Sequence, residues 1–228
     1  MSTAPQINNG KRPFDPYNGL TMVALPSNTP FGNLLVAKMA IEPRIDYINL
    51  KLASIYKPFP IIVHGGIIPT LLPQLIDIPV EEVVYLIRVT TDNLICLWSV
   101  LSDFSKSGKY ESKIRSDSIW KLCEDIKRNG ATHDFYAFLD WLLKFNDVTN
   151  AYKHSFAQLQ LQMVSHREPM VRALCWKQND TCNPQDFKHF NLTELVTGFD
   201  AFYQKTNAWL TAWSSANPDN HQSKKYNL

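Results

Sequence analysis

Proline is distributed unevenly along this chain, and that distribution limits where long helices can form. Of the 14 prolines, 11 precede Val80 and none lies between Val80 and Glu168. Because proline removes a backbone donor and clashes inside a helix, we expect the first part to be extended and irregular and the second to be helical. The sequence therefore predicts an extended, proline-rich N-terminal arm over residues 1–78, a helical bundle domain over 79–216 and a flexible tail over 217–228.

Hydrophobic periodicity predicts four helices within the second part. Apolar residues recur three and four positions apart from about Asp77 to Ser105, which is the spacing of one packed helix face. Further helices are expected at about 109–128, at about 134–165 and from Asn191 onward. The helix at 134–165 is apolar on more than one side, so it should lie centrally. The expected fold class is therefore all-α, a bundle of about four core helices.

Two smaller features are expected outside the four helices. The N-terminal arm should contain a short helix from Pro43 to Tyr56. Residues 168–190 carry β-prone ends around an Asn-Asp-Thr turn, which predicts a small hairpin-like insertion before the last helix. That last helix should begin with a capping box, because Asn191 and Glu194 have the required spacing.

Composition narrows the classes of function. Hydrophobic residues make up 45% of the 228 residues and charged residues 19%, which is typical of a globular protein. A formal net charge of +2 argues against nucleic-acid binding over the whole surface, but not against a small basic cleft. No stretch approaches the ~20 apolar residues of a transmembrane helix, and the N-terminus lacks an apolar signal core. We therefore expect a cytoplasmic protein with no membrane partner.

Sequence motifs for metals and cofactors are missing. The four cysteines form no C-x-x-C pair and the six histidines are scattered, so the sequence predicts no metal site. No P-loop, G-x-G-x-x-G or H-E-x-x-H motif occurs, so no cofactor is expected. The stretch "VHGGI" at 63–67 is similar to oxyanion-hole loops of esterases, but no G-x-S-x-G elbow accompanies it. A tight turn is the simpler interpretation of the two glycines.

A polar stripe on the helix expected at 134–165 is the first candidate site. Asn146, Asn150 and His154 are four residues apart, so each lies only roughly 40° around the helix from the last, and Lys153 lies on the same side. The same face is apolar toward the N-terminus, where an unpaired polar group would cost about 1–3 kcal/mol.

This stripe has three interpretations. It could hydrogen-bond to loop backbone, including that of the N-terminal arm, and hold the loop in place. It could line a ligand or RNA cleft in which His154 is the acid/base and Asn150 and Lys153 hold a phosphate. It could also be a solvated face. The first interpretation is favoured.

A second candidate site is "RNGATH", from Arg128 to His133. An arginine, a polar neighbour and a histidine five positions after the arginine could hold and protonate a scissile phosphate. The same letters also fit a basic helix end, a glycine turn and a helix start.

These motifs resemble those of the HEPN superfamily of prokaryotic helical domains, over roughly residues 78–215. "RNGATH" matches that family's Arg-polar-x-x-x-His wording with Arg128, Asn129 and His133, although it contains a glycine and lies at a helix junction. "NDVTNAYKHSF" contains the family's histidine as His154 but has asparagine where the arginine belongs. The resemblance implies a dimeric helical bundle from a toxin–antitoxin or antiphage system. Many members of the family are metal-independent ribonucleases with the arginine and histidine in a shared cleft.

Two functions follow as hypotheses. The first is a non-enzymatic helical module that binds a protein, nucleotide or RNA partner. The second is a HEPN-like ribonuclease that uses His154 or the pair Arg128 and His133. The missing arginine in the better-placed motif and the near-neutral charge favour the first.

An aromatic seam on the last helix bears on oligomeric state. Phe202, Trp209 and Trp213 recur at helical spacing. Such a seam is most simply core, and its alternative is a homodimer interface, since small helical bundles often pair symmetrically.

Overall fold

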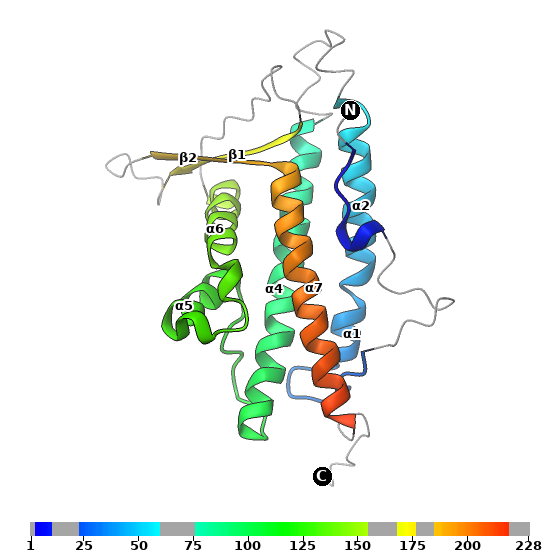
Figure 1. The fold of residues 1–228 in the computed structure, drawn as a ribbon, viewed down its shortest axis with the longest axis vertical. Helices are drawn as coiled ribbons and strands as arrows, with labels where there is room; N and C mark the ends of the chain where they lie inside the picture. The colour runs from blue at the N-terminus through cyan, green and yellow to red at the C-terminus, as the bar shows by residue number, and fades with distance from the viewer. Residues whose placement is uncertain (1–2, 11–22, 60–75, 155–167, 177–184, 219–228) are drawn as a thin grey trace.

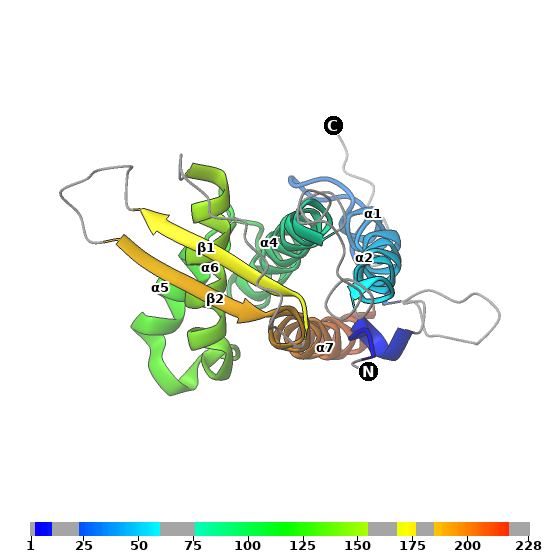
Figure 2. The same ribbon diagram turned by 90° about the horizontal axis from the view of Figure 1, so that it is seen from above.

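Three long helices lie side by side in this protein (Figures 1 and 2). The computed structural model describes residues 3–10, 23–59, 76–154, 168–176 and 185–218. Within these ranges the long helices are α2 (Glu42–Tyr56), α4 (Ile78–Ser107) and α7 (Leu192–Ala216). The short helix α1 (Leu34–Met39) precedes α2, and a 3₁₀ turn (Ile7–Gly10) lies near the N-terminus.

A second group of elements lies on one side of α4 (Figure 1). It consists of α5 (Ile119–Asn129), two 3₁₀ turns (Gly130–Thr132 and Tyr136–Phe138) and α6 (Leu139–His154). Strands β1 (Met170–Trp176) and β2 (Gln185–Asn191) form an antiparallel hairpin that contacts α6. The predicted class, a helical bundle with a small hairpin before the last helix, is confirmed.

Helix α4 is the centre of the bundle, because it contacts α1, α2, α5, α6, α7 and β1. Proline at position 79 falls in its first turn, where the missing N–H has no intrahelical partner to lose, and Gly108 ends it with φ of 69°. By length and composition α4 could cross a membrane, since one 18-residue window has a mean hydropathy of 1.3. That composition is explained by its central position, because 61% of the window is buried.

The expectation of an extended N-terminal arm is not supported by the described residues. Residues 42–56 form α2, whose apolar face is fully buried against the bundle at Ile45, Ile48, Leu52 and Ile55. Ile7 is also buried, and its backbone exchanges hydrogen bonds with the side chain of Asn49. Prolines did not prevent this packing because Pro43 lies in the first turn of α2, where proline is tolerated. The short helix predicted at Pro43–Tyr56 is α2 itself.

Two helix boundaries differ from those expected. The helix predicted at 109–128 begins ten residues later, at Ile119, because Ser118 is its N-cap and accepts a hydrogen bond from the backbone of Lys121. The helix predicted at 134–165 begins at Leu139, and a 3₁₀ turn replaces its first residues. Residues 155–167, the rest of that prediction, lie outside the described residues.

The predicted capping box at the start of α7 is wrong. Asn191 occupies the N-cap position, but its side chain makes no cap hydrogen bond. The N–H of Leu192 instead donates to the carbonyl of Pro169 at 2.9 Å, because the register of the hairpin brings these two residues together. A long-range contact therefore satisfies one of the first N–H groups of α7, which have no partner within the helix.

The aromatic seam on α7 is core. Phe202 is fully buried, Trp213 is 6% exposed and Trp209 packs against Trp98 of α4, with ring centroids 6.3 Å apart. The Nε1 atom of Trp213 donates to Ser105 Oγ at 2.7 Å. The core interpretation is therefore confirmed for these three residues.

Gly198 leaves room for the side chain of Trp141 against the backbone of α7. A Cβ atom at position 198 would lie 2.2 Å from Nε1 of Trp141, which stacks on Phe145 with centroids 5.0 Å apart. Helix interiors normally disfavour glycine by about 1 kcal/mol relative to alanine. We infer that this glycine is needed for space and not for backbone freedom.

We therefore expect Gly198→Ala to destabilise the protein, although alanine is the better helix former. Overpacking costs about 1–3 kcal/mol, which exceeds the gain in helix propensity and should lower Tm by about 2–8 °C. Thermal unfolding measures the change. In a Trp141→Leu background the same substitution should be neutral or stabilising, and an equal loss there would contradict a steric cause.

Candidate functional site

A groove of about 490 Å³ lies between α4 and α6. Its α6 side contains Asn150 and Lys153, two of the residues predicted to bind a ligand. Its α4 side contains Tyr85 and Arg88, together with the buried Val84. The groove is therefore open to solvent, apolar in part and lined by basic and amide side chains.

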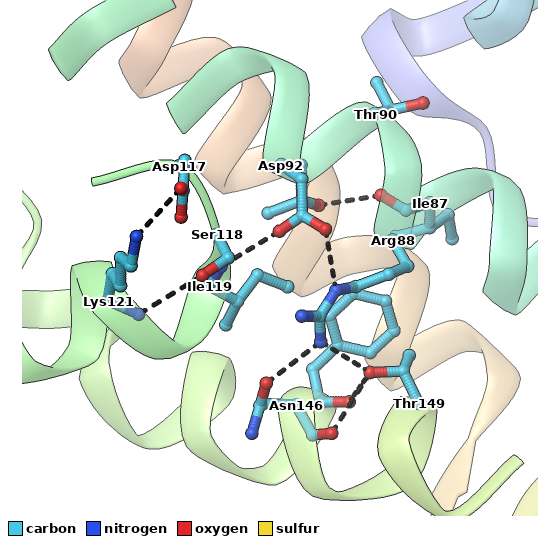
Figure 3. Close-up of polar contacts among 12 residues, drawn as sticks. Ile87, Arg88, Thr90, Asp92, Asp117, Ser118, Ile119, Lys121, Asn146 and Thr149 are labelled. Atoms are coloured by element: carbon cyan, nitrogen blue, oxygen red, sulfur yellow. Dashed lines mark hydrogen bonds and ion pairs between the residues drawn. The ribbon is translucent and has the colours of Figure 1, made fainter. Parts of the chain in front are cut away.

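Arg88 is held in this groove by three other side chains. Its Nε donates to Asp92 Oδ2 at 2.9 Å, and its Nη1 donates to Asn146 Oδ1 at 3.0 Å and to Thr149 Oγ1 at 2.7 Å (Figure 3). The other oxygen of Asp92 accepts from the backbone N–H of Ile119 at 2.9 Å. One network thus connects α4, α6 and the first turn of α5.

Arg88 still has a donor available in the groove. Its second terminal nitrogen, Nη2, makes no hydrogen bond with a described residue, and it is not among the fully buried polar atoms. Figure 3 shows the guanidinium fixed through its other two nitrogens. The three bonds from those nitrogens limit rotation of the side chain, so Nη2 has a defined position.

Asn150 and Lys153 add further open donors. Both side chains are exposed, and neither makes a hydrogen bond or ion pair with the residues that the structure describes. The acidic residues of the groove are Asp92, which is already engaged by Arg88 and Ile119, and Glu81. The formal charges of the lining cancel, because Glu81 and Asp92 balance Arg88 and Lys153.

The predicted stripe is divided between two environments. Asn146 is 3% exposed and bonded to Arg88, so its buried amide has a partner from another helix and not from loop backbone. Asn150 and Lys153 face the groove. His154 is the last residue of α6, and its side chain lies outside the described residues.

The "RNGATH" residues occupy the end of α5 and the turn after it. Arg128 is exposed and makes no hydrogen bond or ion pair with any residue in the described ranges. Asn129 is exposed too, and its amide donates to both the backbone and the side chain of Asp125. The imidazole of His133 is only 5% exposed and lies 3.4 Å from the Asp125 carboxylate. No described contact joins Arg128 to His133.

His133 is enclosed by aromatic and charged neighbours. Its Nδ1 accepts from the N–H of Phe135 at 3.1 Å, and its ring centroid lies 5.2 Å from that of Trp98. Burial lowers the pKa of His133, and this outweighs the opposing effect of Asp125, which is itself ion-paired with Arg115. Because Nδ1 accepts, the neutral imidazole has its proton on Nε2, which is buried 3.4 Å from Asp125 Oδ2 and makes no hydrogen bond with a described residue.

Three residues of the groove network were missed from the sequence: Arg88, Asp92 and Thr149. A usable signal was present, because Arg88 and Asp92 are four residues apart within an otherwise apolar stretch of α4. Opposite charges at that spacing inside a buried helix indicate a paired cluster. Among the described residues, no group of three histidine, cysteine, aspartate or glutamate side chains could hold a metal ion.

Replacing the arginine should cost more stability than replacing the open lysine. In Arg88→Met the Asp92 carboxylate loses its ion pair and Asn146 loses its only described donor, so we expect a loss of about 2–4 kcal/mol. Lys153→Met removes a charge without described partners and should change stability by less than about 0.5 kcal/mol. Urea unfolding measures both, and equal losses would contradict the network.

Folding should hold His133 neutral, which makes stability depend on pH. Because the pKa of His133 lies below its ordinary 6.5 in the folded protein, the unfolded chain binds this proton more readily. Its contribution is present above pH 6.5 and is lost as the pH falls below it. Urea midpoints at pH 7.5 and 5.5 should therefore differ less in His133→Gln than in wild type. His189→Gln, at an exposed histidine, is the control and should retain the wild-type difference.

Comparison with known proteins supplies no family for this chain. No protein-family model, curated protein or solved structure matches it. The HEPN resemblance therefore stays a prediction from short motifs. The α4–α6 groove and the side chains that line it are the features of the described residues that bear on function.

Proposed function

We propose that this protein is a non-enzymatic helical binding module whose α4–α6 groove takes a phosphate-bearing ligand, namely a nucleotide or a segment of RNA. One observation carries the proposal: Arg88, Asn150 and Lys153 line one groove, and each has side-chain N–H donors that no described residue uses. Charge-assisted hydrogen bonds from arginine and lysine are the usual means of holding phosphate oxygens.

Tyr85 supports a nucleotide over a simple inorganic anion. It lines the same groove, is 66% exposed and precedes Arg88 by three residues on α4, so the two side chains are neighbours on the helix. A nucleobase stacked on such a ring gains about 1–3 kcal/mol. Base and phosphate would then be held by adjacent positions of one helix.

Binding is favoured over cleavage by the chemistry of the described lining. Arg88 is committed through two of its nitrogens to Asp92, Asn146 and Thr149, and the buried His133 is not among the residues of the groove. The alternative is a metal-independent, HEPN-like ribonuclease in which His154, next to Lys153, acts as acid/base. Both hypotheses place the protein in the cytoplasm, in a prokaryotic defence or toxin–antitoxin context.

Binding to nucleotide probes tests the proposal. We expect inorganic phosphate to bind weakly, AMP more tightly and a fluorescein-labelled oligouridylate measurably by anisotropy. Lys153→Gln should weaken AMP binding about tenfold, because a charge-assisted hydrogen bond contributes roughly 1.5–3 kcal/mol. Lys205→Gln, at an exposed lysine of α7, is the matched control and should bind as wild type does. Absence of binding to all three probes would overturn the proposal.

Cleavage of a mixed cellular RNA pool in EDTA separates the two hypotheses. A binding module should leave the RNA intact. Cleavage that His154→Ala abolishes, in a protein that still folds, would establish the ribonuclease. Cleavage lost instead in His133→Ala would assign it to the second motif.

A further inference from the structure

Strand β2 has a backbone edge that has no hydrogen-bond partner among the described residues. In the hairpin register, Arg172 of β1 is opposite His189 of β2. Opposed residues in an antiparallel pair alternate between bonded and non-bonded.

One backbone contact fixes the phase of this alternation. The N–H of Leu192 donates to the carbonyl of Pro169, which makes that pair a bonded one, and the Arg172–His189 pair, three positions along the ladder, is therefore non-bonded. Phe187 and His189 therefore direct their N–H and C=O groups away from β1. Neither residue makes a hydrogen bond to any part of the described chain. In Figure 2, β1 lies between β2 and α4, which leaves β2 as the outer strand.

The side chains of β2 leave one aromatic ring exposed on this edge strand. Phe187 is 47% exposed, and its strand contains no proline or bulge. Exposed edges in soluble proteins are normally protected by proline, bulges or charged side chains, because an open edge is a template for another strand, and of these β2 has charged side chains alone. On the opposite face of β2, the side chains of Asp186 and Lys188 are 64% and 27% exposed.

We propose that β2 pairs with β2 of a second copy of this chain, antiparallel and centred on Phe187, to form a four-stranded sheet. In this register Phe187 is opposite its own counterpart, and the two residues exchange both backbone hydrogen bonds. Asp186 is then opposite Lys188 of the second copy, and Lys188 is opposite Asp186, twice across the two-fold axis. Directly opposed unlike charges stabilise a strand pair, so β2 is complementary to itself.

The self-complementarity is specific to this register. A shift by one residue would remove the unlike-charge pairs and place Phe187 opposite a charged residue. Lys188 is already ion-paired with Asp147 of α6 and lies 3.5 Å from Asp186 of its own strand, so its charge is held at the interface. The proposal is independent of the groove, because β2 contributes no residue to it.

Sedimentation equilibrium of the full chain tests the association. We expect a monomer–dimer equilibrium that shifts toward dimer with concentration. Phe187→Pro should abolish the dimer while the hairpin persists, because the N–H that it removes is not used in pairing with β1, and proline is tolerated at such edge positions. Far-ultraviolet circular dichroism and Tm check that the variant folds. A wild type that is monomeric throughout would overturn the proposal.

Disulfide trapping tests the register. In a Cys182→Ser background, Phe187→Cys should cross-link under mild oxidation, because Cα atoms of a bonded antiparallel pair are about 5.5 Å apart. His189→Cys is the matched control. Its two copies would be offset by four residues, roughly 13 Å, which is too far for a disulfide. A dimer that cross-links equally through both positions, or only through His189→Cys, would overturn the proposed pairing.

Discussion

The pairing of Arg88 with Asp92 is the contact on which the second half of the structure depends. Both side chains are partly buried, 18% and 27% exposed, and pairing with hydrogen bonds offsets the cost of removing their charges from water. One oxygen of Asp92 accepts a hydrogen bond from Arg88, and the other accepts from a backbone N–H in the first turn of α5. Asn146 and Thr149 of α6 accept the other two hydrogen bonds of the arginine. The positions of α5 and α6 relative to α4 are therefore set partly by polar geometry. Apolar packing alone would tolerate several orientations.

That arrangement explains why the groove has open donors. A guanidinium has five N–H donors in a fixed fork, and three partners do not use all of them. Because Asn146 and Thr149 face α4, the next turn of α6 brings Asn150 to the edge of the same groove and Lys153 beside it. The residues that bind the arginine and those whose donors have no described partner thus lie on consecutive turns of α6. Hydrogen bonds from two other helix positions hold the arginine in place, whereas Asn150 and Lys153 are exposed at the same groove.

Much of the helical architecture follows from local patterns, whereas the partners of the polar residues do not. The apolar period predicted α4 to within a few residues, and the short helix at Pro43–Tyr56 corresponds to α2. The number of prolines suggested an extended arm, but the position of each proline decides whether a helix can form. Pro43 and Pro79 both lie in the first turn of a helix, where proline is tolerated. The start of α5 was misplaced because the capping residue Ser118 competes with an apolar period that continues on either side of it.

The stripe on α6 was recognised, but its burial and partners were not. A 3.6-residue period shows which residues share a face of a helix. Even so, Asn146 is buried whereas Asn150, one turn later on that face, is exposed. What separates them is the tertiary position of Arg88, which a single sequence does not reveal. Asp147, between them in the chain, pairs with Lys188 of β2, while Asn146 beside it pairs with Arg88. One turn of α6 therefore contacts both the edge strand and the arginine of the groove.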